Sequence, residues 1–121
     1  MKRVVVTGLG IISPIGIGRT EFASNLFQGE SGIIPKSRYS RDGLKFTAGG
    51  DLCQVPFDNY LDPNKTRRFS RASKLALMGS YLALEDAGLR DLKWADPTTV
   101  GVVLGSAWGC LETTVEFYDG I

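Results

Sequence analysis

Two unbroken apolar runs stand near opposite ends of the chain. Residues 3–7 read Arg-Val-Val-Val-Thr, and residues 99–105 read Thr-Val-Gly-Val-Val-Leu-Gly. Neither run alternates apolar with polar positions, which is typical of strands that are buried on both faces of a parallel or mixed sheet. The pattern therefore predicts two central strands.

A long amphipathic helix is predicted between the two runs, over residues 70–87. Its apolar positions recur in steps of three and four, and Gly88 stands where the helix should stop. Alanines dominate the apolar face and Gly79 interrupts it, so we expect this helix to pack close to a neighbour. Strand, helix and strand in this order indicate an α/β unit with a right-handed crossover.

Shorter elements are predicted elsewhere. A short amphipathic helix is expected at residues 20–28, with Thr20 as its cap and Gly29 as its stop. Further elements are a short strand within 45–50, a helical turn within 58–64 before Pro63, and the start of another helix at 113–118.

Composition indicates a folded, soluble protein. The 121 residues are 43% apolar and 22% charged, and the net charge of +1 points to no particular partner. Gly8, Gly10 and Pro14 interrupt the first apolar run too early for a signal peptide, and no stretch approaches the ~18 apolar residues of a membrane span. We therefore expect a cytoplasmic protein with reduced thiols and no membrane contact.

Histidine is absent, and the two cysteines are far apart in sequence. The chain therefore holds no Ser-His or Cys-His nucleophile pair, and no metal site is predicted. Without a histidine to activate them, Cys53 and Cys110 are interpreted as small buried apolar residues.

Gly8-Leu9-Gly10 after the first strand invites a dinucleotide-binding interpretation. However, Ser13 replaces the third glycine of that motif, and Pro14 follows where a helix should present its amides to pyrophosphate. We prefer a tight strand exit, with a nucleotide-binding α/β domain as the weaker alternative.

Residues 65–74 hold five cations and no acid. Arg67, Arg71 and Lys74 follow helical spacing and would share one face, which would attract an anionic partner. An ordinary solvated helix start explains the same pattern equally well. Nucleic acid is only weakly supported, because a single aromatic residue, Phe69, is interleaved with the five cations.

The loop at residues 105–111 leaves the second predicted strand. Ligands of open α/β sheets bind beyond the carboxyl ends of strands, and Trp108 would supply a large apolar wall there. The alternative is a loop packed under core side chains.

Three segments carry a family resemblance. The opening run continues to residue 16 as Gly-Leu-Gly-Ile-Ile-Ser-Pro-Ile-Gly, residues 69–73 read Phe-Ser-Arg-Ala-Ser ahead of Ala-Leu-Glu-Asp-Ala-Gly-Leu at 83–89, and residues 100–106 read Val-Gly-Val-Val-Leu-Gly-Ser. In this order and spacing they resemble the β-ketoacyl-[acyl-carrier-protein] synthases, condensing enzymes of the ketosynthase II type. The opening run is highly specific and the other two are moderately so. The resemblance spans almost the whole chain and is loosest over residues 33–60.

The resemblance implies an α/β, thiolase-like fold built of two related βαβ halves. Residues 1–121 would be the incomplete N-terminal portion of that ketosynthase domain, with part of a mixed sheet and packed helices. The implied reaction moves an acyl group from a carrier protein's phosphopantetheine thiol onto an enzyme cysteine. Malonyl-carrier protein then loses CO2, and its carbanion attacks the acyl-enzyme to give a β-ketoacyl product in fatty acid or polyketide synthesis.

The resemblance also assigns residues. The family's catalytic cysteine, two histidines and a lysine lie beyond residue 121, so this chain alone is expected to be inactive and to contain no catalytic residue. Lys65, Arg67 and Arg68 match the basic surface where the acidic acyl carrier protein docks. Trp108 matches a gating apolar side chain of the acyl pocket, usually smaller, and is expected to shorten or reshape that pocket.

The resemblance implies no cofactor, because phosphopantetheine enters on the carrier protein, and it implies a homodimer that binds acyl and malonyl thioesters. A non-catalytic partner subunit that sets chain length is the main alternative, which the unusual Trp108 favours. Because the two predicted strands lack neighbours within 121 residues, we expect exposed apolar surface and aggregation when the chain is made alone.

Overall fold

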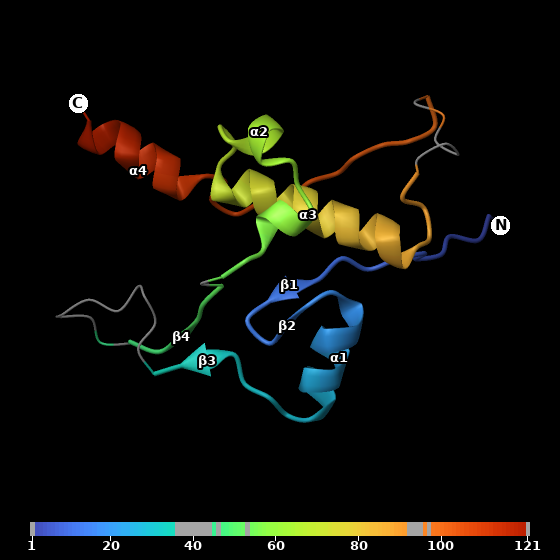
Figure 1. Cartoon of the computed structure of the whole chain (residues 1–121), viewed down its shortest axis with the longest axis horizontal. Coiled ribbons are helices and arrows are strands. Elements are labelled where there is room, and N and C mark those ends of the chain that lie inside the picture. The colour runs from blue at the N-terminus through green and yellow to red at the C-terminus, as the bar shows by residue number, and fades with distance from the viewer. Residues whose placement is uncertain are drawn as a thin grey trace.

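A computed structural model describes residues 2–35, 45, 47–52, 54–91, 96 and 98–120. Within these residues the strands form two separate two-stranded antiparallel sheets, β1 with β2 and β3 with β4, rather than one large central sheet (Figure 1). In chain order the elements are β1 (Ile12–Ser13), β2 (Gly16–Ile17), α1 (Arg19–Phe27), β3 (Ile33–Ile34), β4 (Gly49–Gly50), η1 (a 3-10 helix, Phe57–Asn59), α2 (Pro63–Thr66), α3 (Arg71–Asp86) and α4 (Leu111–Asp119).

Helix α3 is the longest element and holds the centre of the molecule (Figure 1). Ser70 is its N-cap, and the Ser70 hydroxyl oxygen accepts a hydrogen bond from the Ser73 backbone N–H. Gly88, with φ of 71°, follows its last turn in the left-handed conformation. Met78 and Leu82 on this helix are the buried apolar residues of the described chain. The helix predicted over residues 70–87 is thus confirmed.

Helix α1 follows a tight hairpin in which Ile12 pairs with Ile17. The predicted cap Thr20 is wrong, because the helix begins one residue earlier and Gly18, with φ of 83°, occupies the N-cap position. The first turn is completed by Glu21, whose carboxylate accepts a hydrogen bond of 2.8 Å from the Ile17 N–H. Gly29 ends the helix as predicted, with φ of 74°.

The N-terminal segment crosses α3 through two glycines. A Cβ on Gly8 would lie 2.2 Å from the Ala83 carbonyl oxygen, and one on Gly10 would lie 1.8 Å from that of Gly79. This close backbone approach requires glycine at both positions of the segment. It also accounts for the Gly-x-Gly pattern through packing against a helix, without a nucleotide.

Asp86, the last residue of α3, contacts both the N-terminal segment and α1 at this crossing. One carboxylate oxygen accepts a hydrogen bond of 3.0 Å from the Leu9 N–H, and the other lies 2.8 Å from the Arg19 guanidinium. The Asp86 side chain is 19% exposed, so the ion pair is partly shielded from water. The start of the chain and the start of α1 are therefore held by one carboxylate.

The two predicted central strands are not formed. Residues 4–7 and 100–104 run without strand pairing, and Val4 and Val103 are 93% and 100% exposed. The physical reason is that a strand requires a hydrogen-bonding neighbour, and no described segment pairs with either run. The described residues therefore do not confirm the predicted mixed sheet, whereas the predicted exposure of apolar surface is confirmed.

The predictions for the shorter elements are confirmed in part. Gly49 and Gly50 form β4 within the strand predicted at 45–50, although residue 46 lies outside the described residues. The turn predicted before Pro63 is η1, and Pro63 itself begins α2 rather than following a helical turn directly. The helix predicted at 113–118 is confirmed as α4.

Candidate functional site

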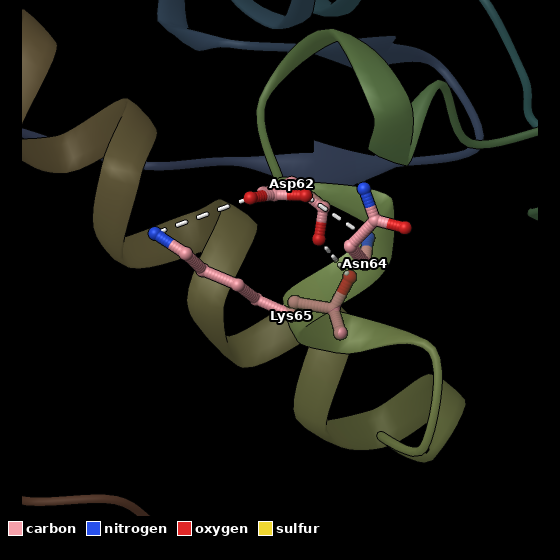
Figure 2. Close-up of polar contacts among 4 residues, drawn as sticks. Asp62, Asn64 and Lys65 are labelled. Carbon is pink, nitrogen blue, oxygen red and sulfur yellow. Dashed lines mark hydrogen bonds and ion pairs between the residues drawn. The ribbon is translucent and has the colours of Figure 1, made fainter.

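The cationic run begins on the one-turn helix α2 and continues into the start of α3. Asp62 is its N-cap: the carboxylate accepts a hydrogen bond of 2.9 Å from the Asn64 N–H, and Pro63 occupies the first turn, where no N–H is needed (Figure 2). The Lys65 ammonium lies 3.9 Å from the same carboxylate, and both side chains are solvent-exposed. This weak ion pair leaves the ammonium accessible to a partner.

Thr66 turns the chain between α2 and α3. Its side chain is buried, and its hydroxyl donates a hydrogen bond of 2.9 Å to the Asp62 carbonyl oxygen. The Phe69 N–H donates to the Thr66 carbonyl oxygen at 3.0 Å. With Thr66 facing inward, Arg67 and Arg68 are exposed in the two positions that follow.

The predicted common helical face of Arg67, Arg71 and Lys74 is wrong. Arg67 is the C-cap residue of α2, and α3 begins only at Arg71, so the two arginines belong to different helices. A chain turn at 67–70 interrupts the helical spacing that the sequence suggested. The structure instead groups Lys65, Arg67 and Arg68 on one exposed turn, which we call the α2 cationic turn.

Arg71 faces inward. Its guanidinium donates a hydrogen bond to the Leu52 carbonyl oxygen and lies 5.8 Å from the centroid of the Phe57 ring. The Lys74 ammonium lies 6.0 Å from the same centroid, at the limit of a cation–π contact. These contacts were missed by sequence reasoning, because no local pattern links α3 to a carbonyl at position 52.

The loop at 105–111 does not follow a strand, contrary to prediction, and Trp108 is 81% exposed. The Gly109 N–H donates a hydrogen bond of 2.9 Å to the Ser106 hydroxyl oxygen, which closes a tight turn around Trp108. The same loop borders an apolar groove of about 420 Å³ against α3. Its lining includes Ala72, Leu75, Ala76, Leu104, Gly105 and Cys110.

Cys110 is the N-cap residue of α4 and is half-buried beside this groove, without a capping hydrogen bond from its side chain. Cys53 lies outside the described residues. Across the described ranges, no group of three or more histidine, cysteine or carboxylate side chains is placed to share a metal ion. Nor does any described helix have the length and apolarity needed to cross a membrane.

The fold resembles that of a chain in a solved ketosynthase/chain length factor structure. The chain superposes on the structure named "The ishigamide ketosynthase/chain length factor" with a TM-score of 0.70 and 22% sequence identity, over 95% of this chain and 28% of that one. At this identity the likeness shows the fold, which is the thiolase-like fold of ketosynthases. Residues 1–119 also match the family described as "Beta-ketoacyl synthase, N-terminal domain". The chain therefore belongs to the beta-ketoacyl synthase family.

Relatives from two bacteria and a plant align with most of this chain. The 3-oxoacyl-[acyl-carrier-protein] synthase 1 of Buchnera aphidicola subsp. Baizongia pistaciae is 38% identical over 90% of this chain and 27% of its own length. The 3-oxoacyl-[acyl-carrier-protein] synthase 2 of Staphylococcus aureus strain COL is 31% identical over 93% of this chain and 27% of its own. The chloroplastic 3-oxoacyl-[acyl-carrier-protein] synthase II of Arabidopsis thaliana is 31% identical over 99% of this chain and 22% of its own length. The chain thus spans less than a third of the length of these relatives.

Proposed function

We propose that this chain is the N-terminal part of a 3-oxoacyl-[acyl-carrier-protein] synthase that acts in fatty acid or polyketide synthesis. The proposed reaction is the decarboxylative condensation of an acyl thioester with malonyl-carrier protein. The observation that carries the proposal is the match of residues 1–119 to the family's N-terminal domain. Catalytic cysteine and histidine residues would be supplied by sequence beyond this chain, in a cytoplasmic homodimer.

Within that protein, the α2 cationic turn would dock the acidic acyl carrier protein. Support comes from the exposure of Lys65, Arg67 and Arg68 on one short turn, where the described residues offer a single weak ion pair, between Lys65 and Asp62. Exposed cations of this kind mainly accelerate encounter with an oppositely charged partner, and salt screens their effect.

Trp108 would contact the acyl chain. It stands on the loop that borders the apolar groove, although its own side chain does not line that groove, and its 81% exposure leaves the indole available to a substrate or to further protein. An indole is larger than the gating side chain usual in the family, so it should limit or reshape the acyl pocket. We expect Trp108→Gly in the complete enzyme to change acyl-chain preference. An unchanged preference would contradict this role.

The first experiment is to read the coding DNA past the codon for Ile121. An open frame with a cysteine after a strand and two later histidines would support an active condensing enzyme. Its product should then condense acyl and malonyl thioesters of carrier protein. A frame that ends at this codon, or one that continues without the cysteine, would refute catalysis. A partner subunit that sets chain length would then be the better account.

A further inference from the structure

Arg71, and to a lesser extent Lys74, differ from the three cations of the α2 cationic turn, because both are half-buried and lie near the Phe57 ring. Lys65, Arg67 and Arg68 are exposed, whereas Arg71 is half-buried and makes two contacts with a segment 14 to 19 positions earlier in the chain. One contact is the hydrogen bond to the Leu52 carbonyl oxygen, and the other is the Phe57 ring. Leu52 lies on the segment that leads into η1, and Phe57 is the first residue of η1, ahead of α2.

The segment that precedes the α2 cationic turn contacts α3 through positions 52, 57 and 60. Arg71 holds it at positions 52 and 57, and farther along, the Tyr60 ring packs edge-to-face on the Tyr81 ring at a centroid distance of 5.4 Å. In Figure 1 the green segment with η1 and α2 lies beside α3, in agreement with these contacts. These contacts hold the residues that precede the α2 cationic turn against α3.

The chemistry of Arg71 suits an attachment better than a docking cation. A cation in the first turn of a helix opposes the helix dipole, so its position there needs a compensating contact. A planar guanidinium satisfies a carbonyl oxygen at its edge while its face lies against an aromatic ring. A lysine ammonium keeps the charge but cannot make both contacts in the same geometry.

We infer that Arg71 is a positioning residue for carrier-protein docking. It latches the 52–57 segment to α3 and thereby fixes the α2 cationic turn, without itself contacting the carrier protein. This inference rests on the proposed docking function, and it divides the cations of residues 65–74 into two roles that the sequence does not distinguish.

Charge-conserving variants separate the two roles. In the protein produced from the complete coding frame, Arg71→Lys should weaken binding of acyl carrier protein about three- to tenfold, because the latch is lost although the charge remains. The matched variant Arg68→Lys should bind within about twofold of the parent, since an exposed cation acts through its charge. The salt dependence of binding should be the same in both. Parent-like binding by Arg71→Lys would overturn the inference.

A double-mutant cycle tests the latch independently of docking. Arg71→Lys and Phe57→Leu should each lower the denaturation midpoint, and together they should lower it by less than the sum of the two shifts, because both break one contact. Additive shifts would refute the latch. Arg68→Gln serves as the docking control: if it leaves carrier-protein affinity unchanged, the proposed docking surface fails, while the cycle still reports whether the latch exists.

Discussion

Where the N-terminal segment crosses α3, Gly10 faces the Gly79 carbonyl oxygen, and a Cβ on Gly10 would lie 1.8 Å from it. Backbone on both sides of this contact has little room to move. We expect Gly10→Ala to lower the free energy of unfolding by about 1–3 kcal/mol, the range typical of overpacking. Urea denaturation of the complete protein, with and without the substitution, would measure this change in the free energy of unfolding.

Gly79 is the matched control for this prediction. A Cβ on Gly79 would meet nothing within 4 Å, although the residue lies in the middle of α3. Gly79→Ala should therefore raise the free energy of unfolding by about 0.5–1 kcal/mol, because alanine loses less backbone entropy in a helix. If both variants shifted stability in the same direction, the packing described for this crossing would be wrong.

Asp96 shows how a short turn alters a carboxyl group. The backbone N–H of Thr98, and then the Thr98 hydroxyl, donate hydrogen bonds of 2.9 and 2.7 Å that lower the pKa of Asp96. At pH values above the ordinary pKa of an aspartate, these hydrogen bonds to the ionised carboxylate stabilise the turn in full. The stabilisation is lost as the pH falls through the lowered pKa of Asp96. Thr98→Val keeps the backbone donor and should raise the Asp96 pKa part of the way back. Carboxyl-carbon NMR titration would detect the change, and an identical titration midpoint would disprove it.

At the scale of elements, the Ser70 cap is the simplest feature to test. Its hydroxyl oxygen accepts from the Ser73 N–H at 3.1 Å, which satisfies one of the free donors at the start of α3. Ser70→Ala should cost ~1 kcal/mol of stability. Ser80→Ala is the control, because that hydroxyl donates to the Ala76 carbonyl oxygen within the helix and its loss should be nearly neutral. Equal losses in both variants would show that capping is not the cause.

Helices could be predicted from sequence because their signals are local. The spacing of apolar residues, Ser70 before α3 and Gly88 after it define that helix without reference to the rest of the chain. The cap of α1 was misassigned because Thr20 is a good capping residue in isolation, whereas the hairpin before it delivers the chain through Gly18. Contacts from the hairpin decide that boundary, and they are not visible in a local pattern.

Strands and the candidate site were harder to predict because both depend on distant partners. Residues 100–104 have a strand-like composition, but a ladder also requires a neighbour that the described chain does not supply. In the same way, the spacing of Arg67 and Arg71 suggested one helical face, yet α2 ends at the buried Thr66 and α3 begins only at Arg71. The cations of the α2 cationic turn were recognised from the sequence, whereas the inward contacts of Arg71 with Leu52 and Phe57 depend on the three-dimensional structure.

At the scale of the whole molecule, the apolar surface is poorly covered. Val103 is fully exposed and Val6 is 81% exposed, whereas Met78 and Leu82 alone are buried among the described apolar residues. Exposed β-branched runs with unpaired backbone groups favour association between chains. We expect the isolated 121-residue chain to self-associate, to bind the dye ANS and to melt without a cooperative transition, as judged by analytical ultracentrifugation, fluorescence and circular dichroism.

The source of this association can be tested at one position. Val103 has no covered surface, so Val103→Lys should preserve the helices while it places a charge in an exposed apolar run, and association should decrease. Ser80→Lys, at an exposed position on α3, adds the same charge away from that run and should leave association nearly unchanged. Equal decreases would assign the effect to net charge rather than to the unpaired run. A monodisperse, cooperatively melting monomer would contradict the expectation itself, since it would show that the helices and the two small sheets of the described residues fold stably without strand partners for the two apolar runs.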